Sequence, residues 1–427
     1  MSKTILEIRD DKFLINGKLT YSTIPGTHKN VHGLLMNARF IQGIFDDKAD
    51  PKRFNRFGYE WDPEANTDRL IEALPEWKKF GLLGFTVGFQ GGMPVITIEN
   101  ETIDNNPFGE DGKSIDPAYL RRMDKLIKAA DDIGMIVIVS LLYQGQVNRF
   151  KDSRAIVNAV KTGSRFLREG KYTNIILEVA NEYNVGYFMS DNPIVSSPQG
   201  ITTLIDIARE ESGGLPTGAS AAGLVYHPEV ARASDVILVH GNTGTEQSYY
   251  DLIKSIKDAN YNKPILCNED SPRFTQLKVA VETGTSWGYY NTHTKQEPPA
   301  DWSITKGEDQ FFAWRMADLL GIPVPEIPYE EQFYFQGFEK DLVYENQRWL
   351  RLASLFPEKI DTVKYYRNGQ FFDIAFEEPY YPLHVQTWIQ KGIQLTGADE
   401  EWRAEILLHS GKVIERKAYI RNSEGKN

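Results

Sequence analysis

The chain has 427 residues, of which 41% are hydrophobic and 25% charged, which is the composition of an ordinary globular protein. Its formal net charge of −11 argues against nucleic acid or an anionic membrane surface as a partner. The single cysteine, Cys267, excludes an intrachain disulfide and a cysteine-based zinc site. No apolar run reaches the roughly 20 residues of a membrane-spanning helix, so we expect no membrane insertion.

The chain opens with MSKTILEIRDDKFLING, which lacks the apolar stretch of a signal peptide. We therefore expect a periplasmic or secreted protein if a signal peptide has been removed, and a cytoplasmic one otherwise. Residues 4–20 predict a short hairpin that turns at Asn16-Gly17, a dipeptide suited to tight turns.

Short apolar segments then alternate with helical patterns along the next 290 or so residues. The predicted strands are residues 34–45, 82–89, 135–143, 174–181, 216–221, 235–242, 263–270 and 285–291. The predicted helices are residues 66–80, 116–133, 153–170, 200–212, 246–259, 273–283 and 308–321, with Asn66 or Thr67 as the first N-cap and Asp116 as the second. Strands that are apolar on both faces and separated by helices predict a parallel sheet, and eight such units favour a (β/α)8 TIM barrel over an open doubly wound sheet. Neither G-x-G-x-x-G after the first strand nor G-x-x-x-x-G-K-[ST] is present, so nucleotide cofactors have no support.

The pattern changes after about residue 322. A Pro-rich connection, IPVPEIPYEEQ, is followed by residues 338–356, which we interpret as a helix. Two hairpins are predicted after it, one turning at Asn368-Gly369 and one at Ser410-Gly411. We therefore expect an α/β barrel domain over residues 1–325, including the N-terminal hairpin, and a small all-β sandwich with its linker and helix over residues 326–427.

The C-terminal segment resembles the small immunoglobulin-like modules that follow bacterial carbohydrate enzymes. The features that carry the resemblance are VKYYRNG at 363–369, EEPY at 377–380, Trp388, Gly392 and the closing strand pair. It covers about 60 residues.

Polar and aromatic residues stand at the ends of the predicted strands, where a (β/α)8 barrel places its active site. They are Asn37, Arg39, Gln90, Tyr143, Gln144, Asn181, Glu182, His240, Asn242, Asn268, Glu269, Trp287 and Tyr289. Strands four and seven face each other across an eight-stranded barrel, so we expect Glu182 and Glu269 to lie opposite one another. Two such carboxyl groups suit cleavage of a glycosidic bond, because one donates a proton to the leaving oxygen while the other attacks or activates water.

The segment LEVANEYN at 177–184 resembles the fourth-strand motif of the clan A, family-5-like (cellulase-like) glycoside hydrolases. The resemblance implies that Glu182 is the general acid/base and that Asn181 binds the sugar 2-hydroxyl. It also implies that Glu178, deeper in the strand, is a structural carboxylate. Tyr183 departs from the pattern, since the family usually has Pro there.

The segment PILCNED at 264–270 resembles the seventh-strand end of the same family, which implies that Glu269 is the nucleophile. Asp270 is a rival carboxylate beside it. By the same resemblance His240 would lie near the nucleophile and Trp287 would form the floor of the sugar subsite. Arg39 could hold Glu269 ionised or pair with Glu178 instead.

Further substrate contacts are expected from the other strand ends and from residues 291–305, a predicted cleft wall. They are Asn37, Gln90, Tyr143, Tyr289 and Trp302.

The sequence thus predicts a retaining glycoside hydrolase that cleaves β-glycosidic bonds in an oligo- or polysaccharide, with carbohydrate as its partner. Neither H-x-H nor H-E-x-x-H spacing is present, so no metal and no cofactor are expected. One alternative is a lyase or dehydratase acting on uronate-containing oligosaccharides through Arg39, His240 and Tyr289. Another is a barrel that binds carbohydrate without turnover.

Overall fold

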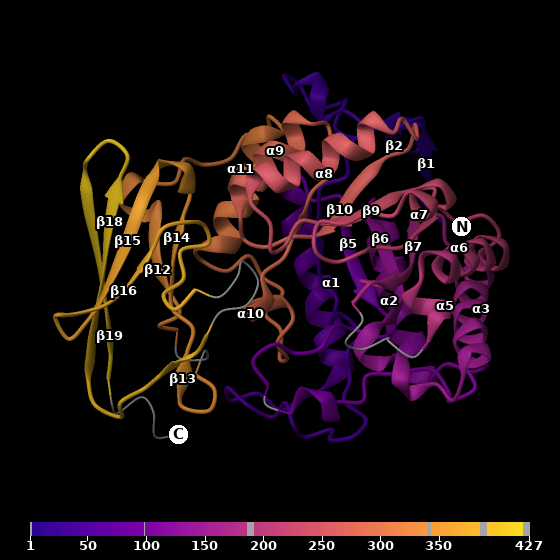
Figure 1. Ribbon diagram of the computed structural model, residues 1–427, viewed down its shortest axis with the longest axis horizontal. Coiled ribbons are helices and arrows are strands. Elements are labelled where there is room, and N and C mark those ends of the chain that lie inside the picture. Colours follow the sequence, from indigo (N-terminus) through magenta and orange to yellow (C-terminus); the bar gives the residue numbers. More distant parts are fainter. Residues whose placement is uncertain (1, 98, 186–191, 340–342, 385–390, 422–427) are drawn as a thin grey trace.

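The computed structural model describes residues 2–97, 99–185, 192–339, 343–384 and 391–421. Parallel strands surrounded by helices form one part of the molecule, and antiparallel sheets from the last quarter of the chain form the other (Figure 1). The protein is therefore a mixed α/β chain with a separate antiparallel region.

The main sheet has six parallel strands in the order β11-β4-β5-β6-β7-β8, and β9 and β10 form a second parallel pair. These two sheets approach each other at both edges. A parallel bridge joins Leu266 of β10 to Ser286, which precedes β11, and the Asp235 amide donates to the Thr217 carbonyl of β8 at 2.8 Å. The strands are β4 (Asn37–Arg39), β5 (Gly84–Gly88), β6 (Ile136–Tyr143), β7 (Ile175–Asn181), β8 (Thr217–Gly218), β9 (Ile237–His240), β10 (Ile265–Glu269) and β11 (Gly288–Tyr289).

Alternate residues of these strands meet in a common apolar interior at the amino ends. The N-terminal hairpin, formed by β1 (Leu6–Arg9), β2 (Lys12–Ile15) and β3 (Lys18–Leu19), packs Leu6 and Phe13 against it. The turn at Asn16-Gly17 is confirmed, because Ile15 pairs with Lys18 across it and both turn residues have positive φ. The strand residues of this interior are Leu35, Ile136, Ile138, Ile176, Val236, Leu238 and Leu266.

Helices cover the outer faces of the parallel strands (Figure 1). The start of α2 is confirmed, since the Asp116 side chain caps it and Pro117 is its first residue. The predicted cap of α1 is wrong. The cap is Asp62, while Asn66 and Thr67 lie inside the helix and donate to the carbonyls of Gln42 and Gly43. The helices are α1 (Pro63–Lys79), α2 (Pro117–Asp132), α3 (Ser153–Glu169), α5 (Pro193–Ser196), α6 (Pro198–Ser212), α7 (Pro228–Ala233), α8 (Glu246–Asp258), α9 (Phe274–Glu282), α10 (Thr292–Lys295) and α11 (Glu308–Leu319).

The antiparallel region encloses a second core. A four-stranded sheet in the order β16-β15-β18-β19 contributes Val363, Trp402 and Ile406, and the β12–β14 pair contributes Phe335 and Leu352. Both predicted hairpins are present, turning at Asn368-Gly369 and around Ser410-Gly411. The strands are β12 (Phe333–Gln336), β13 (Gln347–Arg348), β14 (Arg351–Ser354), β15 (Ile360–Arg367), β16 (Gln370–Ala375), β17 (Ile393–Gln394), β18 (Glu400–Leu408) and β19 (Val413–Ile420).

The helix predicted over residues 338–356 is wrong, because β13 and β14 occupy its second half. All four residues of β14 are buried, with Leu352 in the second core and Arg351 reaching Glu308 of α11. A strand buried on both faces has no alternating pattern, so its apolar residues read equally well as a helix. Trp388, part of the C-terminal resemblance, lies outside the described residues.

Buried polar contacts hold the two parts together. The Glu378 carboxylate accepts from the amides of Phe274 and Thr275 at 2.6 and 3.2 Å, at the start of α9. Arg351 and Glu308 form an ion pair at 2.5 Å, with side chains only 2% and 4% exposed. Within the described ranges, no helix is both long and apolar enough to cross a bilayer.

Candidate active site

A cavity of about 480 Å³ opens at the carboxyl ends of the parallel strands. It brings together seven of the strand-end residues named from the sequence, which are Arg39, Tyr143, Gln144, Asn181, Glu182, Asn242 and Glu269. His240, at the end of β9, contacts both glutamates from below the cavity surface.

The turn after β7 directs Glu182 toward the cavity. Glu182 takes a left-handed backbone conformation, with φ of 50°, and its amide donates to the Ser220 hydroxyl at 3.2 Å. Such a conformation costs about 1–3 kcal/mol in a residue other than glycine, so the surrounding structure must hold it. Tyr183 stands where the family pattern has Pro, and its amide donates to the Ser220 carbonyl at 3.2 Å. Pro has no amide hydrogen and could not make this bond.

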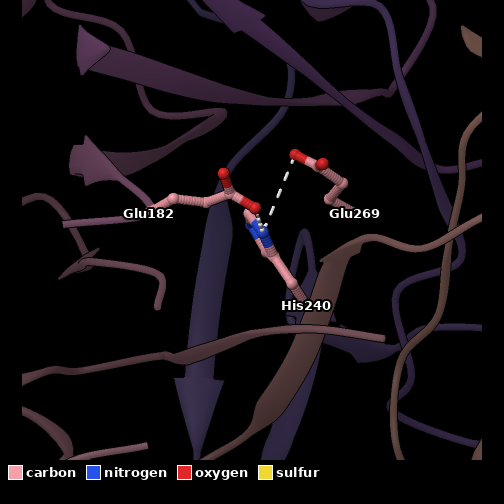
Figure 2. A group of neighbouring side chains, drawn as sticks. All are labelled: Glu182, His240 and Glu269. Carbon is pink, nitrogen blue, oxygen red and sulfur yellow. Dashed lines mark hydrogen bonds and ion pairs between the residues drawn. The ribbon is translucent and has the colours of Figure 1, made fainter. Parts of the chain in front are cut away.

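Glu182 accepts hydrogen bonds from two neighbouring strand ends. Its Oε1 lies 2.9 Å from His240 Nδ1, and its Oε2 accepts from Gln144 Nε2 at 2.9 Å. The side chain is 17% exposed, so it keeps a route to a bound ligand. Figure 2 shows the His240 ring between Glu182 and Glu269, with an interaction to each.

Glu269 is the more deeply buried of the two glutamates, with a side chain 9% exposed. Arg39 forms an ion pair with it, Nε to Oε2 at 2.9 Å, and Asn242 Nδ2 donates to its Oε1 at 2.8 Å. His240 Nδ1 lies 3.7 Å from Oε2. Of the two partners left open for Arg39, the ion pair is therefore with Glu269 rather than Glu178.

The three titratable groups shift one another's pKa. Burial lowers the pKa of His240, but the charges of Glu269 and Glu182 outweigh burial and raise it above its ordinary value. Burial raises the pKa of Glu182, but the hydrogen bond and charge of His240 outweigh burial and hold it below its usual value. The two shifts favour a protonated His240, which would donate from Nδ1 to the ionised carboxylate of Glu182.

The pKa of Glu269 is shifted the other way. Burial raises it, and the charges of Arg39 and His240 oppose the rise without cancelling it. The pKa of Glu269 is thus shifted up and that of Glu182 down, which is the reverse of the order that a protonated Glu182 and an ionised Glu269 would need. His240 Nδ1 lies 2.9 Å from Glu182 Oε1, so a proton on that nitrogen is available to the carboxylate when a ligand changes the surroundings.

Glu182, His240 and Glu269 could also be considered as metal ligands. Each offers one ligand atom, and the three atoms lie within 4.8 Å of one another. The guanidinium of Arg39 already lies 2.9 Å from a Glu269 oxygen, so a divalent cation there would face an immediate positive charge. The donor set therefore fits a proton-sharing trio better than a metal site.

The two other carboxylates near these strand ends do not line the cavity. Glu178 lies deeper in β7 and accepts from Asn268 Nδ2 at 3.0 Å. Asp270 accepts from Trp287 Nε1 at 2.6 Å and from the Ser271 amide at 2.8 Å, and burial raises its pKa to about 8. Of Glu269 and Asp270, only Glu269 therefore lines the cavity.

Trp287 and Tyr289 do not reach the cavity, contrary to expectation. Both pack outward against Phe312 of α11, and the Tyr289 hydroxyl donates to Asp309 at 2.7 Å. Tyr290 lines the cavity instead, with Arg39 over its ring at 5.4 Å. Side chains alternate between the two faces of a strand, so an error of one residue in register places the wrong aromatic inside.

Asn37, Gln90 and Trp302 also lie outside this cavity. Asn37 Nδ2 donates to the carbonyls of Cys267 and Trp287, so it joins β4 to β10 and to the residue before β11. Gln90 accepts from the Tyr143 amide at 2.8 Å and donates to Asn106. Trp302 is 2% exposed and its indole donates to Asn66 at 3.1 Å.

Sequence reasoning missed several cavity-lining residues that lie between the strands and the longer helices, on loops and in short helical turns. They include Met93, Val95, Ile96, Asn100, His293 and Gln296. These loops have no periodic pattern, so only the fold brings them to the site. Residues 291–305, predicted as a cleft wall, do supply two of them.

No protein-family model matches the chain, and neither does any curated protein. Among solved structures, a glycoside hydrolase of unassigned specificity from Bacteroides vulgatus is similar, with 11% identity, a TM-score of 0.48, and coverage of 98% of this chain and 83% of that one. An endo-β-1,4-mannanase from Thermotoga petrophila has 11% identity, a TM-score of 0.44 and coverage of 91% and 97%. An FMN-binding β-glucuronidase from Facaelibacterium prausnitzii L2-6 has 10% identity, a TM-score of 0.46 and coverage of 98% and 58%.

The chain spans only 58% and 46% of the length of the two β-glucuronidases that head these matches. Every one of these TM-scores lies below 0.5.

Proposed function

We propose that this protein is a retaining glycoside hydrolase that cleaves β-glycosidic bonds, with Glu182 as acid/base and Glu269 as nucleophile. One observation carries the proposal: carboxylate oxygens of the two residues lie within 4.8 Å of each other in a cavity at the strand ends. Retaining enzymes hold their carboxyl groups about 5–5.5 Å apart, whereas inverting enzymes need about 6.5–9.5 Å to admit a water.

The architecture we propose is a (β/α)8 barrel over residues 1–325 and an immunoglobulin-like β-sandwich over residues 326–427. The ring of neighbouring strands from β4 to β11, with β11 paired to β4, supports the barrel. The core shared by the four-stranded sheet and the β12–β14 pair supports the sandwich. A site at the carboxyl ends of parallel strands is where such barrels place their chemistry.

In the first step, a Glu269 oxygen attacks the anomeric carbon while the bond to the leaving oxygen breaks. That oxygen takes a proton from Glu182, which first receives it from His240 Nδ1, 2.9 Å from Glu182 Oε1, and is left ionised after the donation. The product is a glycosyl ester on Glu269. Arg39 and Asn242 hold the nucleophile in place, because each contacts one of its two oxygens.

In the second step, Glu182 takes a proton from water, whose oxygen attacks the anomeric carbon and releases Glu269. Asn181 would orient the sugar through its 2-hydroxyl. Within the described residues its Oδ1 is buried without a hydrogen-bond partner, so it can accept from that hydroxyl. Tyr143 and Tyr290 line the same cavity and offer further contacts.

The test is a screen of aryl β-glycosides and of plant and algal polysaccharides with four proteins in parallel. Wild type should release sugar, while kcat/KM should fall by at least about 100-fold in Glu182→Gln and by about 10⁴-fold or more in Glu269→Gln. Glu178→Gln is the matched control, because it changes a buried glutamate of the same strand that does not line the cavity. It should stay within about tenfold of wild type.

Equal activity of wild type and Glu269→Gln on the same substrate would overturn the proposal. The lyase alternative predicts instead a product that absorbs ultraviolet light, with Arg39, His240 and Tyr289 as its candidate groups. The Tyr289 hydroxyl is committed to Asp309 outside the cavity, which favours hydrolysis over that alternative.

A further inference from the structure

A second, larger cavity lies between the α/β part and the antiparallel region. Its volume is about 650 Å³. The α/β part supplies Phe57, Tyr59 and the segment around Glu297, and the antiparallel region supplies Tyr334, Trp349 and Arg351. In Figure 1, α10 lies between the two parts. The segment that begins with α10 lines both cavities.

The two cavities adjoin. Ile96 and His293 line both of them, and Gln296 lines the catalytic cavity while the next residue, Glu297, lines the second. A ligand that extends beyond the catalytic cavity on this side therefore reaches the antiparallel region.

The wall shared by the two cavities is held firmly. Glu297 accepts from the Ile96 amide at 2.9 Å and pairs with Arg56. On the far side, Arg351 donates to His293 Nδ1 at 2.9 Å and to Asn291 at 3.2 Å. The antiparallel region thus fixes the position of a residue that lines the catalytic cavity.

Aromatic side chains stand partly exposed on both walls of the second cavity. Tyr59 is 53% exposed, and Phe57, Tyr334 and Trp349 are half-buried. Aromatic faces pack well against the C–H faces of pyranose rings, and the polar groups between them can bind hydroxyls. A purely apolar ligand would instead desolvate the charged groups without replacing their hydrogen bonds.

The charges of the lining nearly balance. Its basic and acidic side chains are Arg69, Lys306 and Arg351 against Glu72, Glu297, Asp301 and Glu339. No excess of positive charge is available to bind a polyanion, so the surface fits an uncharged glycan better than a uronate polymer.

We propose that the second cavity binds the distal units of a neutral oligosaccharide whose scissile bond lies between Glu182 and Glu269. The antiparallel region is then part of the substrate site and selects chains over single sugars. The position of the scissile bond rests on the proposed function, whereas the binding of the chain does not.

The test measures binding in the Glu269→Gln background, so that turnover does not interfere. The probes are β-1,4-linked di- and hexasaccharides of glucose, mannose and xylose, titrated by calorimetry. The hexasaccharide of at least one sugar should bind about tenfold or more tightly than its disaccharide. Added Trp349→Ala or Tyr59→Ala should each reduce this gain several-fold, the loss typical of truncating one packed aromatic contact.

Tyr419→Ala is the matched control, because Tyr419 is 51% exposed on β19 and lines neither cavity. It should leave the gain unchanged. If Trp349→Ala misfolds, Tyr59→Ala still tests the proposal, because Tyr59 is exposed on a loop of the α/β part and its truncation should not affect folding. No binding of any hexasaccharide, no gain with chain length, or a gain retained in both variants would overturn the proposal.

The outcome is separable from that of the hydrolase test. Length-dependent binding that needs Trp349, in a protein that hydrolyses nothing, would support the groove and reject the hydrolase. Hydrolysis by wild type, with the hexasaccharide bound no more tightly than the disaccharide, would support the hydrolase and reject the second cavity as a binding site.

Discussion

The interior enclosed by the parallel strands differs sharply between its two ends. At the amino ends it is apolar, and Leu6 and Phe13 of the hairpin close it. At the carboxyl ends the same strands bury Arg39, His240 and Glu269, whose charges cost free energy to desolvate. The comparison indicates that the amino ends stabilise the fold, whereas the buried charges at the carboxyl ends lower its stability. Substitutions at the amino ends should therefore affect mainly stability, and substitutions at the carboxyl ends mainly activity.

The largest effect is expected at the polar end. Glu269→Gln keeps the size of the side chain but removes the nucleophile, so kcat/KM should fall by about 10⁴-fold or more. The melting temperature should fall only by what the lost ion pair with the buried Arg39 costs, because Gln can still accept from Asn242. Steady-state kinetics and calorimetry on one preparation check both statements, and a variant that retains a tenth of wild-type activity would contradict the first.

The next largest effect is expected at the apolar end. Phe13 is fully buried, so Phe13→Ala should lower the free energy of unfolding by about 3–5 kcal/mol. Activity well below the melting temperature should remain near wild type, because the hairpin lies at the end of the strands away from Glu182 and Glu269. Leu19→Ala is the control, because Leu19 lies on the neighbouring strand β3 and is 36% exposed. It should lower the free energy of unfolding by less than about 1 kcal/mol.

A loss of activity in Phe13→Ala out of proportion to its loss of stability would break the comparison between the two ends. It would mean that the hairpin shapes the site through the strands.

A smaller effect concerns pH. The folded pKa of His240 is raised above its unfolded value, so its contribution to stability is complete below the unfolded pKa and is lost as pH rises through the folded pKa. The stability difference between wild type and His240→Asn should therefore be greatest near pH 6 and shrink toward alkaline pH. Thermal melts of both proteins between about pH 5.5 and 9 measure it, and a difference that grows with pH would contradict the raised pKa.

The smallest effect is expected from metal removal. Because Arg39 lies 2.9 Å from Glu269, dialysis against EDTA should leave kcat/KM within about twofold of its starting value. Activity that disappears and returns with Zn²⁺ or Mn²⁺ would show that Glu182, His240 and Glu269 bind a metal after all.

The strand ends that carry charge were predictable, and the reason is local. Asn181-Glu182 and Asn268-Glu269 end mainly apolar runs, and polar residues at such a point mark where a buried strand reaches a site. The hairpin turns at Asn16-Gly17 and Asn368-Gly369 were equally local, since both dipeptides favour positive φ.

Features that depend on which face of a strand is buried were not predictable. The segment WGYY at 287–290 offers aromatics to both faces, and only the packing of Trp287 and Tyr289 against Phe312 leaves Tyr290 for the cavity. The strand β14 was missed because it is buried between the two parts of the molecule. Arg351 of β14 and Trp349, two residues before it, line the second cavity. This could not be foreseen, because the sequence predicted a helix for the segment.

The most direct test of the central claim is to trap the covalent intermediate. Wild type is incubated with a 2-deoxy-2-fluoro glycoside of the sugar found in the screen, digested, and analysed by peptide mass spectrometry. We predict one fluoroglycosyl group on the peptide that contains Glu269, attached to that residue. An adduct on Glu182, Asp270 or any other residue, or complete hydrolysis with no adduct at all, would contradict the assignment of Glu269 as the nucleophile of a retaining enzyme.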